Sequence, residues 1–171
     1  WEESFAYMLG DALLVAPALE PGVSSRSLLL PPGRWLELQT GLVHEGDNET
    51  ELSAQPGWPP LLLREGHAVP LAVVTEPAAS EPRSFDAQAV EWVAFPAADG
   101  SFSGRLSWDD GVSRLKGRAE ATHVAVSLSG SDLQVYTTGA PLPAGFQPVS
   151  RVLLPGGNER LPWFRAGFSV R

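Results

Sequence analysis

Glycine and proline recur throughout this chain and restrict it to short elements of secondary structure. The 17 glycines and 16 prolines leave no stretch free of both that is longer than the thirteen residues Arg83 to Phe95. Because proline removes a backbone donor and both residues disfavour helix interiors, long helices are excluded. Turn signals return about every 8 to 15 residues, which is typical of short strands packed as sandwiches. We therefore expect an all-β fold.

Composition excludes several classes of function. The 171 residues are too few for a complete (β/α)8 barrel, which needs about 250. A net charge of −8 without a basic patch argues against nucleic acid as a partner. The chain lacks cysteine and its three histidines, His44, His67 and His123, are far apart, so we expect no metal and no cofactor. No apolar run approaches the roughly 20 residues of a membrane span, and the start is unlike a signal peptide, which favours a cytoplasmic protein with no membrane partner.

Four local patterns predict particular elements. The segment 4–9 is a candidate helical turn ended by Gly10, and the apolar run 13–16 predicts a strand buried on both faces. Runs 28–30 and 34–38 flank Pro31-Pro32-Gly33 and form a candidate hairpin. The clearest hairpin is at 124–135, where apolar and small residues alternate around a turn at Ser129-Gly130-Ser131-Asp132.

Between residues 75 and 82 the sequence contains two prolines and no large apolar residue, which is typical of a linker. We therefore expect a first β-sandwich domain at 1–76, a linker at 77–82 and a second β-sandwich domain at 83–171. Within the second domain, residues 85–95 favour a strand, because most of the apolar side chains would share one face.

Two kinds of residue are candidates for chemistry. Asp109 and Asp110 precede Gly111, where an Asp-Gly turn between strands 106–108 and 112–114 is favoured over a catalytic carboxylate pair. Of the six tryptophans, most lie among apolar neighbours and are expected in the core. Trp58 lies in Pro56-Gly57-Trp58-Pro59-Pro60 and is the candidate substrate-binding residue, because a proline-rich loop can hold its ring exposed to a sugar. His44 and His67 are expected in loops, since neither forms a recognisable Ser-His-Asp arrangement.

Four segments in order and spacing carry a family resemblance, at 10–17, 30–35, 40–41 and 60–70. Together they resemble the end of glycoside hydrolase family 31, the α-glucosidase and α-xylosidase family, over Phe5 to Pro70. Residues 104–111 resemble the distal C-terminal module of that family. The family often has an aromatic residue and Asp after the tryptophan that corresponds to Trp35, whereas this chain has Leu36 and Glu37.

The resemblance implies that residues 1–17 leave a catalytic (β/α)8 barrel and that proximal and distal C-terminal β-sandwiches follow. It also implies that the catalytic aspartates lie upstream, so no residue here is expected to be catalytic. The chain would pack on the barrel of its parent enzyme, or self-associate through apolar surface, including the run 13–16, that the missing barrel leaves exposed. The parent would hydrolyse α-glycosidic bonds with retention.

Two alternatives stay open at this point. The tryptophan content and Trp58 suggest a carbohydrate-binding module with an oligosaccharide partner. A self-contained hydrolase would have to use Asp109 or Asp110.

Overall fold

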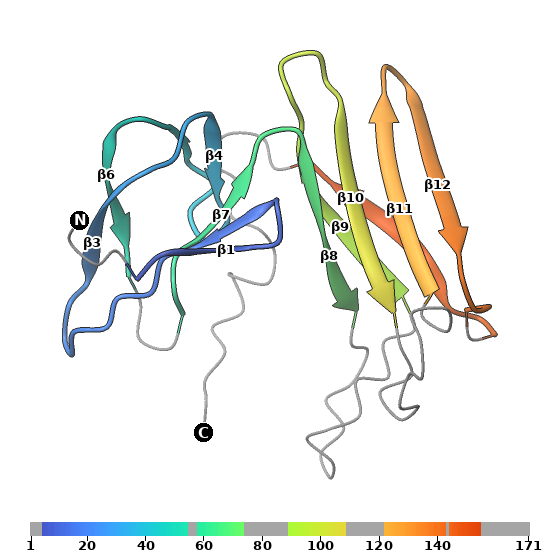
Figure 1. Ribbon diagram of the computed structural model, residues 1–171, viewed down its shortest axis with the longest axis horizontal. Coiled ribbons are helices and arrows are strands. Elements are labelled where there is room, and N and C mark those ends of the chain that lie inside the picture. The colour runs from blue at the N-terminus through green and yellow to red at the C-terminus, as the bar shows by residue number, and fades with distance from the viewer. Residues whose placement is uncertain (1–4, 55–57, 74–88, 109–121, 143, 155–171) are drawn as a thin grey trace, which may run out of the picture. The chain divides into compact units, whose positions relative to one another are not determined.

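The computed structural model describes residues 5–54, 58–73, 89–108, 122–142 and 144–154 (Figure 1). Within these ranges the regular elements are all β-strands, and no helix occurs. The expected all-β class is thus confirmed. The described residues also include no helix long and apolar enough to cross a membrane.

The chain divides into two compact units, and the division falls between His67 and Ala68. This point lies earlier than the expected boundary because the strand that begins at His67 belongs to the sheet of the second unit. The expected linker at 77–82 lies outside the described residues and stays a prediction.

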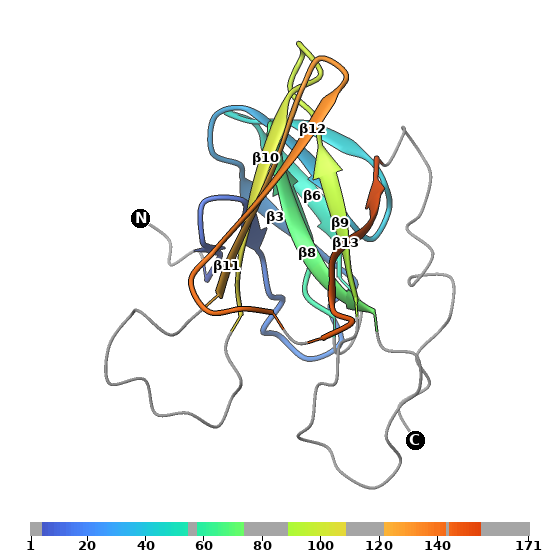
Figure 2. The same ribbon diagram turned by 90° about the vertical axis from the view of Figure 1, so that its right-hand side faces the viewer.

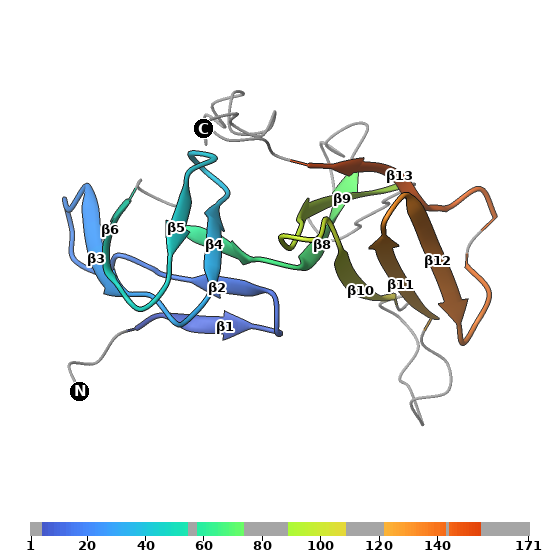
Figure 3. The ribbon, with the colours of Figure 1, turned by 90° about the horizontal axis from the view of Figure 1, so that it is seen from above.

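The first unit has two layers of strands around one hydrophobic core. Its larger sheet has the order β1 (Tyr7–Leu9), β2 (Leu13–Val15), β7 (Leu61–Arg64), β4 (Arg34–Glu37) and β5 (Val43–Glu45). A separate pair, β3 (Ser25–Leu29) and β6 (Glu49–Ser53), forms the other layer (Figure 3). Leu14, Trp35 and Leu62 of the larger sheet share a core cluster with Leu28 and Leu52 of the pair. The apolar residues of both layers are thereby removed from water.

Three local expectations meet different outcomes in this unit. The run 13–16 is buried, as a strand between two neighbours should be, with Leu14, Val15 and Ala16 at most 4% exposed. The expectation that a missing barrel would expose this run is therefore wrong. The segment expected as a helical turn contains strand β1 instead, although Gly10 does take a positive φ in the turn that follows.

The candidate hairpin around Pro31-Pro32-Gly33 is also wrong. Strand β3 pairs with β6, whereas β4 pairs with β5 and β7, so the turn carries the chain from one layer to the other. The indole Nε1 of Trp35 donates a hydrogen bond to the carbonyl oxygen of Pro31 at 2.8 Å. This bond holds the crossing segment against the core.

The second unit is built on a six-stranded sheet. Its order is β12 (Asp132–Thr138), β11 (Thr122–Ser129), β10 (Phe102–Trp108), β8 (His67–Val73), β9 (Ala89–Phe95) and β13 (Gln147–Leu153). Strand β13 runs parallel to β9, and Figure 2 shows the two side by side. The strand expected within 85–95 is confirmed over the described part, and Trp92 is fully buried in its core cluster.

The hairpin at 124–135 is confirmed as β11 and β12. Ser129 pairs with Asp132, and Gly130 supplies the positive φ of the two-residue turn between them. By contrast, Leu106 pairs with Val124 and Trp108 with Thr122. Residues 106–108 are therefore not paired with 112–114, and the tight Asp-Gly hairpin expected there is wrong; residues 109–121 themselves lie outside the described part of the chain.

Candidate functional site

An exposed apolar surface surrounds strand β1 at the edge of the larger sheet of the first unit. Most of its large side chains are more than half exposed: Phe5 at 55%, Tyr7 at 55%, Leu9 at 61% and Leu19 at 60%. Tyr7 pairs with Val15 and Leu9 with Leu13, so alternation directs these two side chains to one face of the sheet. We call Phe5, Tyr7, Leu9 and Leu19 the β1 surface. Phe5 and Leu19 line one pocket. Several large exposed apolar side chains around one edge strand are typical of a surface that packs on another protein element.

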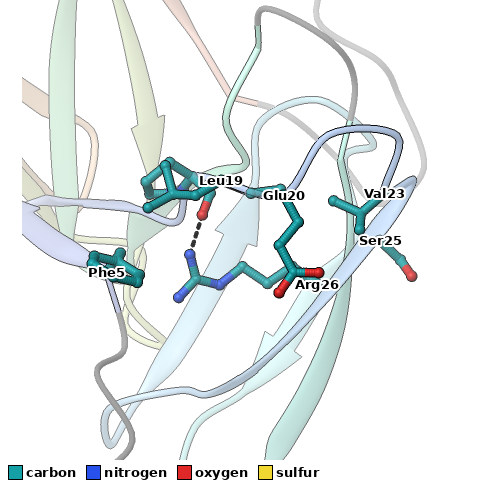
Figure 4. A pocket seen from close by; sticks show the side chains of 8 residues that line it. Phe5, Leu19, Glu20, Val23, Ser25 and Arg26 are labelled. Carbon is teal, nitrogen blue, oxygen red and sulfur yellow. Dashed lines mark hydrogen bonds between the residues drawn. The ribbon is translucent and has the colours of Figure 1, made fainter.

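A pocket of about 310 Å³ adjoins the β1 surface (Figure 4). Arg26 lines the pocket, and its guanidinium donates a hydrogen bond to the carbonyl oxygen of Pro17. Five of the eight lining residues are apolar, and the other three are Glu20, Ser25 and Arg26. The lining residues are Phe5, Pro17, Ala18, Leu19, Glu20, Val23, Ser25 and Arg26. A pocket lined by apolar residues and by an anchored guanidinium can receive an apolar side chain together with an acceptor group.

Trp58, the sequence-predicted site residue, is 43% exposed. The segment that follows it is anchored by Gln39, whose Nε2 donates to the carbonyl oxygen of Pro59 at 2.5 Å and whose Oε1 accepts from the backbone N–H of Leu61 at 3.0 Å. The amide of one side chain therefore fixes two points of the backbone just after Trp58. An indole held in this way can stack on a flat apolar face of a ligand.

Two of the other described tryptophans are core residues. Trp35 and Trp92 are at most 1% exposed, in the two separate hydrophobic cores. Trp108 packs its ring on Phe146 with 4.6 Å between the ring centroids. The core assignment made from their apolar neighbours is thus confirmed for Trp35 and Trp92, whereas Trp108, expected in the core on the same grounds, is only partly buried.

A buried polar cluster that the sequence did not reveal lies at the β4–β5 turn. Glu37 is 2% exposed, and its Oε2 accepts hydrogen bonds from Thr40 Oγ1 at 2.7 Å and from His44 Nε2 at 3.1 Å. Its Oε1 is buried without a hydrogen-bond partner. The Thr40-Gly41 turn signal, combined with hairpin pairing, is the pattern that could have placed residues 37 and 44 together.

His44 and His67 do not lie in loops, so the expectation for these two residues is wrong. His44 is on β5, His67 begins β8 and His123 is on β11. His67 Nδ1 bonds the carbonyl oxygen of Glu65 at 2.8 Å, and His123 Nδ1 lies 3.0 Å from Ser107 Oγ on the neighbouring strand. Within the described ranges, no three His, Cys, Asp or Glu residues gather in a way that could hold a metal ion. Asp109 and Asp110 lie outside those ranges.

Comparison with known proteins agrees with this architecture. Residues 1–69 match the glycosyl hydrolase family 31 C-terminal domain. The 1,3-alpha-isomaltosidase of Kribbella flavida is 44% identical over 41 residues, which are 24% of this chain and 6% of that protein. The intestinal sucrase-isomaltase of Rattus norvegicus is 31% identical over 123 residues, which are 67% of this chain and 6% of that protein.

A solved structure extends the likeness over both units. The family 31 alpha-xylosidase of Xanthomonas citri superposes with a TM-score of 0.65 at 26% identity, and the match covers 90% of this chain and 16% of that one. The strands and these matches define the C-terminal β-region of a glycosidase. The chain belongs to glycoside hydrolase family 31, whose C-terminal domain lies here at residues 1–69. It spans less than a tenth of the length of the curated relatives named above.

Proposed function

We propose that this chain is the non-catalytic C-terminal region of a family 31 glycosidase and that it stabilises the catalytic barrel by packing on it. The observation that carries the proposal is the β1 surface, where four large apolar side chains are at least 55% exposed at the edge of a sheet. Burying such side chains stabilises an interface by about 25 cal/mol for each Å² of apolar surface removed from water.

The position of the β1 surface in the chain supports a barrel as its partner. Strand β1 lies within residues 1–17. The resemblance to family 31 implies that this segment directly follows the catalytic barrel. The matched alpha-xylosidase is several times longer than this chain, because the match covers only 16% of it. A chain that leaves a barrel and continues as β1 would bring the β1 surface next to that barrel.

The non-catalytic role rests on where the resemblance places the catalytic aspartates, upstream of the segment 10–17. The whole protein would hydrolyse α-glycosidic bonds with retention, through a glycosyl-enzyme intermediate. In that reaction this chain supplies stability and no reacting group.

The test begins with the reading frame upstream of Trp1, which the proposal requires to encode a barrel. The barrel part is produced alone and together with residues 1–171, and its soluble yield, thermal midpoint and hydrolysis of aryl α-glucosides and α-xylosides are measured. We expect the chain to raise all three, and Leu9→Lys to abolish the gain. Leu29→Lys is the matched control, because Leu29 is 68% exposed on β3 and lies outside the β1 surface.

Two results would overturn the proposal. One is hydrolysis by the purified chain that persists through rigorous purification. The other is a barrel part whose stability does not change when the chain is added.

A second candidate function, oligosaccharide binding, is favoured by the exposure of Trp58. Its indole face can stack on the apolar face of a pyranose. Titration calorimetry with maltooligosaccharides and with xyloglucan fragments measures this directly. The proposal is supported if the sugar binds to the natural chain and to the Trp108→Leu variant but not to the Trp58→Ala variant. The absence of heat at millimolar sugar rejects it.

A further inference from the structure

Strand β12 is the end strand of the six-stranded sheet, and among the described residues it pairs with β11 alone (Figures 1 and 3). All seven of its residues are exposed. Proteins commonly protect such an edge with lysine, proline or a bulge. Strand β12 has none of these: its sequence, Asp-Leu-Gln-Val-Tyr-Thr-Thr, carries one charge at the first residue, and its register with β11 is unbroken.

The backbone groups that face outward follow from the turn. A two-residue hairpin closes on a hydrogen-bonded pair, which here is Ser129 with Asp132. Hydrogen-bonded and non-hydrogen-bonded pairs then alternate along an antiparallel ladder. The backbone N–H and C=O groups of Leu133, Val135 and Thr137 therefore point away from β11 and are available to a further strand.

The side chains of the same three residues share the core face of the sheet. Leu133 pairs with Leu128 and Val135 with Val126, so they continue the apolar row of β11. Val126 is buried, whereas Leu133 and Val135 are each 42% exposed. The apolar row therefore extends past the covered part of the core and ends at an open edge.

We propose that β12 pairs antiparallel with β12 of a second copy of this chain, about a two-fold axis at Val135. In this register Val135 meets Val135 of the second copy, and Leu133 meets its Thr137. Residues 133, 135 and 137 of one copy then lie opposite residues 137, 135 and 133 of the other. Their outward-facing backbone N–H and C=O groups can therefore hydrogen-bond to one another. The leucines and valines of both copies form one continuous apolar strip.

The polar residues of β12 also fit this register. Gln134 meets Tyr136 of the second copy on the opposite face. These two side chains already bond each other within one chain, since Tyr136 Oη donates to Gln134 Oε1 at 2.7 Å. The two copies of Asp132 lie at opposite ends, separated by about 20 Å at roughly 3.4 Å per residue, which is beyond the screening length of physiological salt, about 8 Å. The strand therefore complements itself in hydrogen bonding, apolar contact and charge.

Sedimentation equilibrium of the full 171-residue chain tests the proposal. We expect a weight-average mass that rises with concentration toward twice that of the monomer. Added sodium chloride should strengthen the association, because each copy carries a net charge of −8. Val135→Lys should raise the Kd at least about tenfold by placing a charge in the apolar strip. It also lowers the net negative charge, so a general charge effect would act in the opposite direction.

Ser103→Lys is the matched control, because it makes the same change of charge at an exposed position on β10. A chain that remains monomeric at all concentrations overturns the proposal. So does association that Val135→Lys and Ser103→Lys leave equally strong, which would point to another surface, such as the β1 surface.

Cross-linking tests the register separately, because the natural chain has no cysteine. In a hydrogen-bonded antiparallel pair the Cα atoms are about 5.5 Å apart, which is within the range of a disulfide. On mild oxidation we expect Val135→Cys to form a covalent dimer and Ser103→Cys to form little. The same low yield from both variants contradicts the two-fold axis at Val135.

Discussion

The indole ring of Trp92 on β9 lies against the backbone of Gly104 on β10, two strands away in the same sheet. A Cβ atom on Gly104 would be 2.7 Å from ring atom Cζ3 of Trp92 and 2.6 Å from the carbonyl oxygen of Ala68. Trp92 is fully buried, and its Nε1 donates to the carbonyl oxygen of Pro148 at 2.9 Å. The ring is therefore fixed at both ends, and the lack of a side chain at position 104 makes room for it.

Gly104→Ala should lower the free energy of unfolding by about 1–3 kcal/mol, the usual cost of overpacking a core. The added methyl group would meet a carbonyl oxygen and a ring that is held by its own hydrogen bond, and neither can move away easily. Ser103→Ala, at the exposed neighbouring position, serves as the control. Urea denaturation followed by tryptophan fluorescence measures both, and a Gly104→Ala variant as stable as the control would contradict this packing.

Sequence reasoning succeeded where the pattern was local. The alternation at 124–135 and Gly130 predicted β11, β12 and their turn, since strand periodicity and a two-residue turn are both written in neighbouring residues. The burial of Trp35 and Trp92 followed from their apolar neighbours. The turn depends on neighbouring residues, whereas the two tryptophans are large apolar side chains that any core formed around them would bury.

It failed where the outcome depended on pairing between distant segments. The Pro31-Pro32-Gly33 turn was also a hairpin signal, but β3 pairs with β6, whose paired residues lie 20 to 28 positions away, and the two strands form a second layer over the core. For the candidate site, the exposure of Trp58 agrees with its proline-rich context, whereas the β1 surface was missed. Its residues are apolar, as core residues also are, so the sequence alone does not mark them as exposed. The structure shows that β1 is an edge strand of its sheet, with no described strand of that sheet on its outer side.

The buried Glu37 cluster leads to the second prediction. Glu37→Ala should destabilise the first unit by about 1–3 kcal/mol, because Thr40 and His44 would both lose the acceptor that they now share. Glu37→Gln should cost less, since its amide oxygen can still accept one of these bonds and a neutral group is easier to bury. The measurement is the free energy of unfolding of both variants in urea.

Glu51→Ala provides the control for the loss of a glutamate, because Glu51 is exposed on β6. It should change the stability by less than about 0.5 kcal/mol. Equal stability of Glu37→Ala and Glu51→Ala would show that the hydrogen bonds of Glu37 contribute nothing to the fold.

The turn between β9 and β10 gives a prediction on pH. The pKa of Asp99 is lowered from its ordinary value, first by the hydrogen bond from the Ser101 side chain and then by that from the Ser101 backbone N–H, whose nitrogen lies 2.9 Å from Asp99 Oδ1. A carboxyl group whose pKa is lower in the folded chain stabilises the fold above its unfolded pKa, and this contribution is lost as the pH falls through the folded pKa. Asp99→Asn should therefore make the stability less dependent on pH in the acid range.

In a carbon NMR titration, Ser101→Ala should move the pKa of Asp99 upward and Ser103→Ala should leave it in place. Because the backbone N–H of residue 101 remains, Ser101→Ala should raise the pKa of Asp99 only part of the way to its ordinary value. If the pKa of Asp99 does not change in this variant, the serine hydroxyl is not a cause of its lowering.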